Sequence, residues 1–179
     1  MSRFMRWEEV STQACSIGKA SSVFGDLWTL LIVRQIFFGL KRFSEIQKSL
    51  GITKHRLTDR LSRLIEEGLI YKHLYDENYN RFEYLLTEKG LDLYPVLIAL
   101  GQWGDKWMKD CDGVPIEYVH TNCGKVTKPT LSCSCCGEPM KLGEFSLKVG
   151  PGLCEKHNRG ELEGADKMIY EKINGSEAK

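Results

Sequence analysis

The stretch that decides the fold is SEIQKSLGITKHRLTDRLSRLIEEGLIYKHLYDENYNRFEYLL, residues 44–86. Its first part predicts two helices separated by a tight turn, because Ser44 and Thr53 are N-cap residues and Gly51 can end the first helix. Its second part predicts a β-hairpin, since strand-forming residues at 69–75 and 82–86 flank a turn cluster. Helix, turn, helix and hairpin in this order are typical of a winged helix-turn-helix.

The predicted second helix, residues 53–67, has two chemically different faces. Leucine and isoleucine recur at helical spacing and form one apolar stripe, at Leu57, Leu61, Leu64 and Ile65. The opposite face carries side chains that can reach base edges and phosphates in the major groove: Asp59 can accept from a cytosine amino group, and Arg63 can reach guanine or phosphate. The candidate DNA-binding residues are Lys54, His55, Arg56, Thr58, Asp59, Ser62 and Arg63 on this helix, Ser44 before it, and Asn80 and Arg81 in the hairpin.

The positive charge of the chain is local. The 179 residues carry a formal net charge of only +1, but residues 41–63 hold seven Lys or Arg against Glu45 and Asp59. A grafted basic face of this kind predicts binding to double-stranded DNA. The alternatives are a solvated basic surface, or a winged helix that serves as a protein-interaction module.

Helices are also predicted on both sides of this region. Residues 16–24 and 27–38 precede it, with Asp26 as the cap of the second helix, which is apolar nearly all round and therefore central to the core. Thr87 caps a long helix over 88–110, which Pro95 should kink or split. The apolar positions of this helix suit a partner helix as well as a core.

The chain shows no export signal at 1–10, and its most apolar run, 27–38, is shorter than the roughly 20 residues of a membrane span. A cytoplasmic protein is therefore expected. Its seven cysteines, four of them between 123 and 136, then predict reduced thiols or metal ligands rather than disulfides. Cys15 opens the first helix, where the dipole and Lys19 favour a reactive thiolate, although a small buried packing residue is the alternative.

Two pairs of metal-ligand type stand in the C-terminal part, His120-x2-Cys123 and Cys133-x2-Cys136, and each is followed by glycine. A Cys3His set is one that structural zinc takes, and the spacing resembles a zinc ribbon. Cys135 is an extra thiol, and Cys154-x2-His157 is a further pair, so the ligand choice stays open. The alternative is a metal-free β-rich lobe with buried thiols.

The predicted architecture is α+β, with three parts. Residues 1–112 form the winged helix-turn-helix and dimerisation domain, 113–160 a small β-rich, zinc-ribbon-like lobe, and 161–179 a charged helical tail. An enzyme is not expected, because no phosphate-binding glycine loop, HExxH or nucleophile elbow is present. A thiol oxidoreductase that uses Cys133 and Cys136 is the enzymatic alternative.

Two long stretches, CSIGKASSVFGDLWTLLIVRQIFFGLKRFSEIQKSLGITKHRLTDRLSRLIEEGLI (15–70) and FEYLLTEKGLDLYPVLIALGQWGDKW (82–107), resemble the HxlR-type family of bacterial winged-helix regulators, relatives of the MarR group. The resemblance implies a homodimeric repressor or activator, joined through its N-terminal and long C-terminal helices. It also implies a near-palindromic operator with half-sites roughly 34 Å apart. A family cysteine at the place of Cys15 implies thiol or redox sensing in some members, and the Cys-rich part resembles the C-terminal extension of longer members.

Overall fold

The computed structural model describes residues 14–108 and 111–177, and its contacts divide the chain into two compact units. One unit is Phe24–Pro129, and the other joins Met1–Val23 with Thr130–Lys179. Three predictions fall partly or wholly outside the described residues. They are the absence of an export signal at 1–10 and the last residues of the predicted helices 88–110 and 161–179. The three-part division predicted at residues 112 and 160 stays a prediction.

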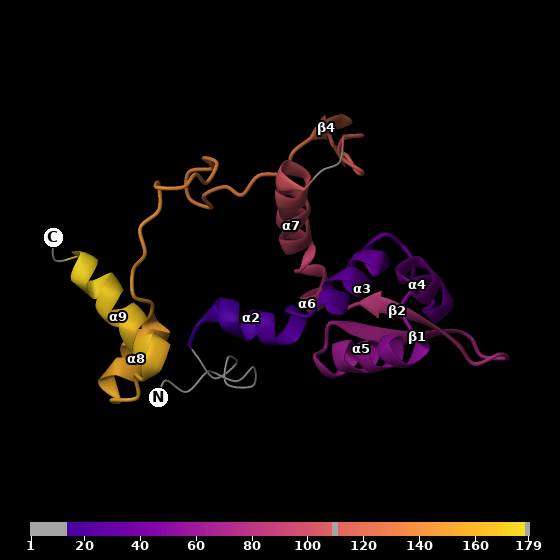
Figure 1. Ribbon diagram of the computed structural model, residues 1–179, viewed down its shortest axis with the longest axis horizontal. Helices are drawn as coiled ribbons and strands as arrows, with labels where there is room; N and C mark the ends of the chain where they lie inside the picture. Colours follow the sequence, from indigo (N-terminus) through magenta and orange to yellow (C-terminus); the bar gives the residue numbers. More distant parts are fainter. Residues whose placement is uncertain (1–13, 109–110, 178–179) are drawn as a thin grey trace. The chain divides into compact units, whose positions relative to one another are not determined.

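The unit Phe24–Pro129 starts with three helices that lie beside a two-stranded hairpin (Figure 1), namely α3 (Leu27–Phe37), α4 (Phe43–Leu50) and α5 (Lys54–Glu66). Their boundaries follow from capping. The carboxylate of Asp26 accepts a hydrogen bond from the backbone N–H of Thr29 (3.1 Å), and the hydroxyl of Thr53 accepts one from Arg56 (3.4 Å). Gly51 ends α4 with a φ of 61°, a conformation that glycine adopts without strain. These three predicted boundaries are confirmed.

The start of α4 differs from the prediction. Ser44 lies inside the helix, so its predicted role as N-cap is wrong, and Arg42 occupies the capping position. The carboxylate of Glu45 accepts hydrogen bonds from the backbone N–H groups of Arg42 (3.0 Å) and Lys41 (3.2 Å). An acidic residue in the first turn can bond back to the residue that begins the helix, so Glu45 fixes this end.

The core of the unit is built around α3, as its continuous apolar sequence predicts. Ile32, Val33 and Ile36 are buried, and the buried amide of Gln35 donates a hydrogen bond to Ser49 of α4. The apolar stripe of α5 packs into the same core, and each of its leucines contributes roughly 1.5–3 kcal/mol by leaving water. The fully buried stripe residues are Leu57, Leu61 and Leu64.

The predicted hairpin consists of β1 (Ile70–Asp76) and β2 (Arg81–Leu86), paired antiparallel from Ile70 opposite Leu86. The backbone of Lys41 pairs with it, because the N–H of Tyr84 donates to the Lys41 carbonyl oxygen at 2.8 Å. In Figure 1 the tip of this hairpin extends beyond the neighbouring helices. The hairpin is therefore the wing that the sequence predicts.

The predicted long helix is split near Pro95 into α6 (Glu88–Leu91) and α7 (Tyr94–Trp107), so Pro95 stands in the first turn of α7. Thr87 caps α6 by accepting from the N–H of Gly90 at 3.1 Å. A Cβ atom at Gly90 would lie 2.1 Å from the carbonyl oxygen of Leu69, so only glycine fits this contact. This close contact places α6 against Leu69, the residue before β1.

The same unit ends in a small hairpin, β3 (Tyr118–His120) and β4 (Lys125–Thr127), in which Tyr118 pairs with Thr127. The side-chain amide of Gln102 on α7 donates to the carbonyl oxygen of Pro129 at 2.7 Å. This bond ties the end of the small hairpin to α7.

The second unit contains α8 (Pro151–Asn158) and α9 (Gly164–Glu177). It also contains α2 (Ser16–Phe24) except for its last residue, Phe24, which belongs to the other unit. Its best-defined contact is the carboxylate of Asp166, 7% exposed, which accepts from the backbone N–H of Ala14 (2.9 and 3.1 Å) and pairs with the Lys156 ammonium (3.0 Å). Burial raises the pKa of Asp166, but the hydrogen bonds from Ala14 and Lys156 outweigh it and leave the pKa lowered. Asp166 thus holds the chain before α2 against the helices α8 and α9.

Candidate nucleic-acid interface

The helix α5 presents one face to the core and the other to solvent, as the sequence predicts. Its leucine stripe is buried, whereas the candidate DNA-binding side chains point the other way. Lys54 and Arg56 are exposed near the N-terminal end, and Arg63 is half-buried about two turns further on. The remaining candidates on α5 are also exposed: His55, Thr58, Asp59 and Ser62.

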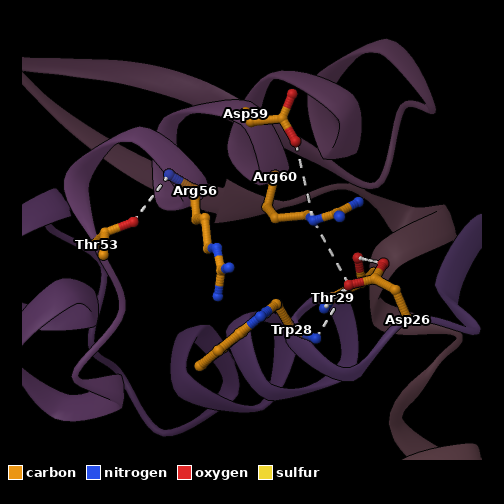
Figure 2. Close-up of polar contacts among 7 residues, drawn as sticks. All are labelled: Asp26, Trp28, Thr29, Thr53, Arg56, Asp59 and Arg60. Atoms are coloured by element: carbon orange, nitrogen blue, oxygen red, sulfur yellow. Dashed lines mark hydrogen bonds and ion pairs between the residues drawn. The ribbon is translucent and has the colours of Figure 1, made fainter.

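An ion pair that sequence reasoning did not identify joins α5 to the start of α3. The guanidinium Nε of Arg60 lies 3.6 Å from the Asp26 carboxylate, which also binds the backbone and hydroxyl of Thr29 (Figure 2). The carboxylate that begins α3 therefore also contacts α5. In the sequence Arg60 is one of seven basic residues in a window, and only its place at the edge of the leucine stripe sets it apart.

Asp59 is the acidic residue that the sequence assigns to base reading. Its carboxylate lies 3.9 Å from the Arg60 guanidinium, and the side chain is 65% exposed. An ion pair this long and this exposed to solvent is weak, so the Asp59 carboxylate remains accessible to a ligand. Arg60 is accordingly shared between Asp26, which is more sheltered, and Asp59 (Figure 2).

Two cationic side chains of the wing lie over aromatic rings. Arg81 lies over the ring of Tyr79 with its guanidinium carbon 4.9 Å from the centroid, and Asn80, beside them, has a positive φ of 48°. Both predicted wing residues, Asn80 and Arg81, are exposed at the turn. The sequence prediction did not include Lys72, whose ammonium lies 5.8 Å from the ring centroid of Phe82. The aromatic rings contact Arg81 at the turn of the wing and Lys72 on its first strand.

Arg42 links α4 to the wing and is also absent from the predicted set. Its guanidinium lies 4.7 Å from the ring centroid of Tyr75, and its Nε lies 3.4 Å from the carboxylate of Glu83. Ser44, the predicted contact on α4, is exposed in the first turn of that helix. The basic surface therefore continues from the first turn of α4 to the wing.

Cys15 stands immediately before α2 and is half-buried. Its sulfur accepts a hydrogen bond from the backbone N–H of Gly18 at 3.4 Å, and its carbonyl oxygen accepts from Lys19 at 3.0 Å. The thiol therefore occupies the N-cap position, which is where the sequence places it. All seven cysteines fall within the described ranges and are free thiols.

Each of the two predicted metal-binding pairs forms a tight turn by itself. The Nδ1 atom of His120 lies 3.4 Å from the Cys123 sulfur, and Gly124 follows with a φ of 67°. In the other pair, backbone N–H groups of Cys136 and then Cys135 lower the pKa of the Cys133 thiol. Across residues 14–108 and 111–177, no three potential ligands gather around one point. The turns suit metal-binding thiolates, and zinc stays a prediction.

None of the helices among the described residues combines the length and the hydropathy that crossing a bilayer requires. The buried helix α3, the helix α5 after a tight turn, and the hairpin β1–β2 that follows α5 define the winged helix-turn-helix class. Residues 23–112 match the family model of the HxlR-like helix-turn-helix proteins. The match covers half of the chain, and the protein belongs to this family.

Relatives described as HTH-type transcriptional regulators extend the likeness. An uncharacterized HTH-type transcriptional regulator of Mycobacterium tuberculosis is 40% identical over 141 residues, which cover 79% of this chain and 89% of that protein. An alignment of this length must continue beyond residue 112, where the family match ends. The chain is thus similar to regulators of transcription over most of its length.

Two solved structures are similar in fold and in sequence. The crystal structure of PA1607, described as a candidate transcription factor, has a TM-score of 0.70 and 32% identity, and the match covers 79% of this chain and 99% of that one. The redox regulator HypR in its oxidized form has a TM-score of 0.50 and 28% identity, over 54% of this chain and 100% of HypR. The predictions of a winged helix-turn-helix and of the HxlR-type family are confirmed.

Proposed function

We propose that this transcriptional regulator binds duplex DNA as a homodimer, with α5 in the major groove and the wing on the adjacent backbone. One observation carries the proposal: the leucine face of α5 is buried while the basic and polar face is exposed. Arg56 and Arg63 have the length and the donors to reach guanine or phosphate. A protein with this role acts where the DNA is, in the bacterial cytoplasm.

The proposed homodimer rests on α7. Within the described part of the chain no side chain of α7 is fully buried, although the helix is rich in apolar residues. Val96, Leu100, Trp103 and Trp107 recur at three- and four-residue intervals and therefore share one face. Leu100 is 51% exposed and Trp107 is 65% exposed. A second copy that presents the same stripe would cover this face, as a two-fold dimer requires.

The test of DNA binding uses Arg56→Ala and Arg63→Ala, measured on duplex sequences enriched from a random pool. Each substitution should weaken binding by roughly 1–3 kcal/mol if the residue reads a base. Lys167→Ala is the matched control, because Lys167 is an exposed cation on α9, outside the helix-turn-helix. If both arginine variants bind like the wild type at physiological salt, α5 is not the recognition helix.

A thiol-responsive form of this function is the second candidate, supported by the half-buried Cys15 at a helix N-terminus and by the likeness to the redox regulator HypR. Dilute hydrogen peroxide should then change the operator affinity of the wild type and of Cys111→Ser, a control at an exposed cysteine. It should leave Cys15→Ser unchanged. An equal response of Cys15→Ser and wild type would contradict thiol sensing through Cys15.

We also propose structural zinc binding at the predicted ligands, which are His120 and Cys123 in the unit Phe24–Pro129 and Cys133 and Cys136 in the other unit. The proposal rests on the residue types, on their spacing and on the turn that each pair forms by itself. Elemental analysis of the purified protein should find one zinc per chain in the wild type and in Cys111→Ser, and less in Cys123→Ser. A wild-type protein purified without stoichiometric zinc would contradict it.

A further inference from the structure

A cavity of about 420 Å³ lies between α7 and the segment that follows it. Its α7 wall consists of Gln102, Asp105 and Lys106, which share one face of the helix at intervals of three and four residues. The opposite wall is the chain from Val114 to Lys128, which includes the β3–β4 hairpin. All of this wall lies beyond residue 112, where the family match ends.

Two contacts hold the walls together without closing the space. The amide of Gln102 binds the carbonyl oxygen of Pro129, just beyond β4. The hydroxyl of Tyr118 lies 3.2 Å from the place where a Cβ atom at Gly101 would stand, so the absence of a side chain at Gly101 lets Tyr118 approach α7. The cavity is therefore set by specific contacts within the unit Phe24–Pro129.

The cavity and the apolar stripe lie on opposite faces of α7. At about 100° per residue, Gln102 and Asp105 point roughly opposite to Leu100 and Trp107 around the helix axis. A second copy seated on the stripe would therefore leave the cavity open. The dimer does not account for this space.

The lining of the cavity indicates the chemistry of a ligand. Val114, Ile116 and Tyr118 alternate along the chain, as residues on one side of an extended segment do, and provide the apolar surface. The charged residues balance, with Asp105 and Glu117 against Lys106 and Lys128, so the cavity favours neither an anion nor a cation.

The Tyr118 hydroxyl is the polar group suited to orient a ligand. Burial, with smaller effects of Asp105 and Tyr94, raises the pKa of Tyr118, so at neutral pH the hydroxyl remains a hydrogen-bond donor. A volume of about 420 Å³ lies within the range of pockets for small organic ligands, roughly 300–1,000 Å³.

We propose that this cavity binds a small, uncharged aromatic molecule with one hydrogen-bonding group. One face of α7 then binds the ligand, and the opposite face forms the proposed dimer contact. The apolar wall holds the ring, and the Tyr118 hydroxyl binds the polar group. Because α7 carries the proposed dimer contact, a ligand here is placed to influence DNA binding. That consequence rests on the proposed function, whereas binding itself does not.

The test is a titration of the full-length protein, in the absence of DNA, with three probes that share one ring system. These are 1-naphthol, which is uncharged, 1-naphthoate, an anion, and 1-naphthylmethylammonium, a cation. Binding is followed by NMR shifts of the isoleucine and valine methyl groups, because Val114 and Val126 line the cavity beside Ile116. We expect saturable binding of 1-naphthol that shifts the Ile116 methyl, with at least about tenfold weaker binding of both ions, because an unpaired charge is costly to bury.

Ile116→Arg should weaken 1-naphthol binding about tenfold or more, and Val114→Arg should do the same. Both positions are about half exposed (46% and 45%), so a charged side chain there need not be buried for the chain to fold. Val119→Arg is the matched control, since Val119 is an exposed valine of the adjoining β3–β4 hairpin that does not line the cavity. Absent 1-naphthol binding, equal binding of all three probes, or unchanged binding to both cavity variants would overturn the proposal. None of these results would affect the DNA-binding proposal.

Discussion

Asp26 and Arg60 join the start of α3 to the middle of α5, with 3.6 Å between the carboxylate and the guanidinium Nε (Figure 2). Both side chains are about one-quarter exposed, so the pair is partly sheltered from solvent. The leucine stripe fixes which face of α5 is buried. The ion pair adds a directional contact between α3 and α5 at the edge of this stripe.

A double-mutant cycle should detect this pair. Asp26→Asn keeps a good N-cap but removes the charge, and Arg60→Met keeps an apolar stem of similar length. We expect a coupling of about 0.5–1 kcal/mol in the free energy of unfolding, measured in urea. The more exposed pair Lys141–Glu144 is the control and should show a smaller coupling. Strictly additive effects of Asp26→Asn and Arg60→Met would show that the contact does not hold α5.

The salt dependence of binding should separate phosphate contacts from base contacts. Lys54 is an exposed point charge at the N-terminal end of α5. Lys54→Ala should weaken binding by a similar factor on all DNA sequences and reduce the slope of log K against log salt by about one. Lys167→Ala should leave the slope unchanged. An unaltered slope for Lys54→Ala would mean that Lys54 contacts no phosphate.

A charge in the apolar stripe of α7 should separate the proposed dimer. Leu100→Asp places a carboxylate opposite its symmetry mate and removes apolar contact area, so the dissociation constant of the dimer should rise by about tenfold or more. Asp105→Asn changes the charge on the cavity-lining face of α7, roughly opposite the stripe, and should remain dimeric. The measurement is sedimentation equilibrium over a range of concentrations. If Leu100→Asp sediments as the wild type does, the dimer uses another surface.

The contact of Asp166 should make the second unit sensitive to acid. Its pKa is lowered in the folded chain. A lowered pKa stabilises the fold above the unfolded value of about 3.9, and this contribution is lost as the pH falls through the lower, folded value. At neutral pH, Asp166→Asn should speed hydrogen exchange at the Ala14 amide, which donates to Asp166, whereas Glu163→Gln, at an exposed carboxylate, should not.

The stability difference between wild type and Asp166→Asn should be full at neutral pH and vanish below the folded pKa of Asp166. A difference that persists in strong acid would show that packing, rather than the charge of Asp166, is responsible. Equal exchange of the Ala14 amide in wild type and Asp166→Asn would show that the hydrogen bond contributes nothing.

Local signals predicted the order of elements in the winged helix. Thr53 and Gly51 mark helix ends by their own chemistry, and the spacing of Leu57, Leu61 and Leu64 determines which face of α5 is buried. Pro95 likewise predicts the break between α6 and α7. These features depend on neighbours within a few residues, so the sequence displays them.

Contacts between distant segments were not predictable in the same way. Serine is a common N-cap, but Arg42 occupies that position on α4, and the Glu45 carboxylate in the first turn accepts from two backbone N–H groups there. Arg60 and Asp26 are 34 positions apart, and nothing local pairs them. The helix α8 was missed because its sequence, PGLCEKHN, is short and lacks a clear apolar stripe.

The most direct test of the central claim is selection of bound sequences from random duplex DNA, followed by affinity measurements over a range of salt concentrations. We predict a near-palindromic site with half-sites roughly 34 Å apart, and a steep fall in affinity with rising salt that is weaker in Lys54→Ala. Enrichment of no sequence, together with an affinity that does not depend on salt, would contradict the claim that α5 and the wing form a DNA-binding surface.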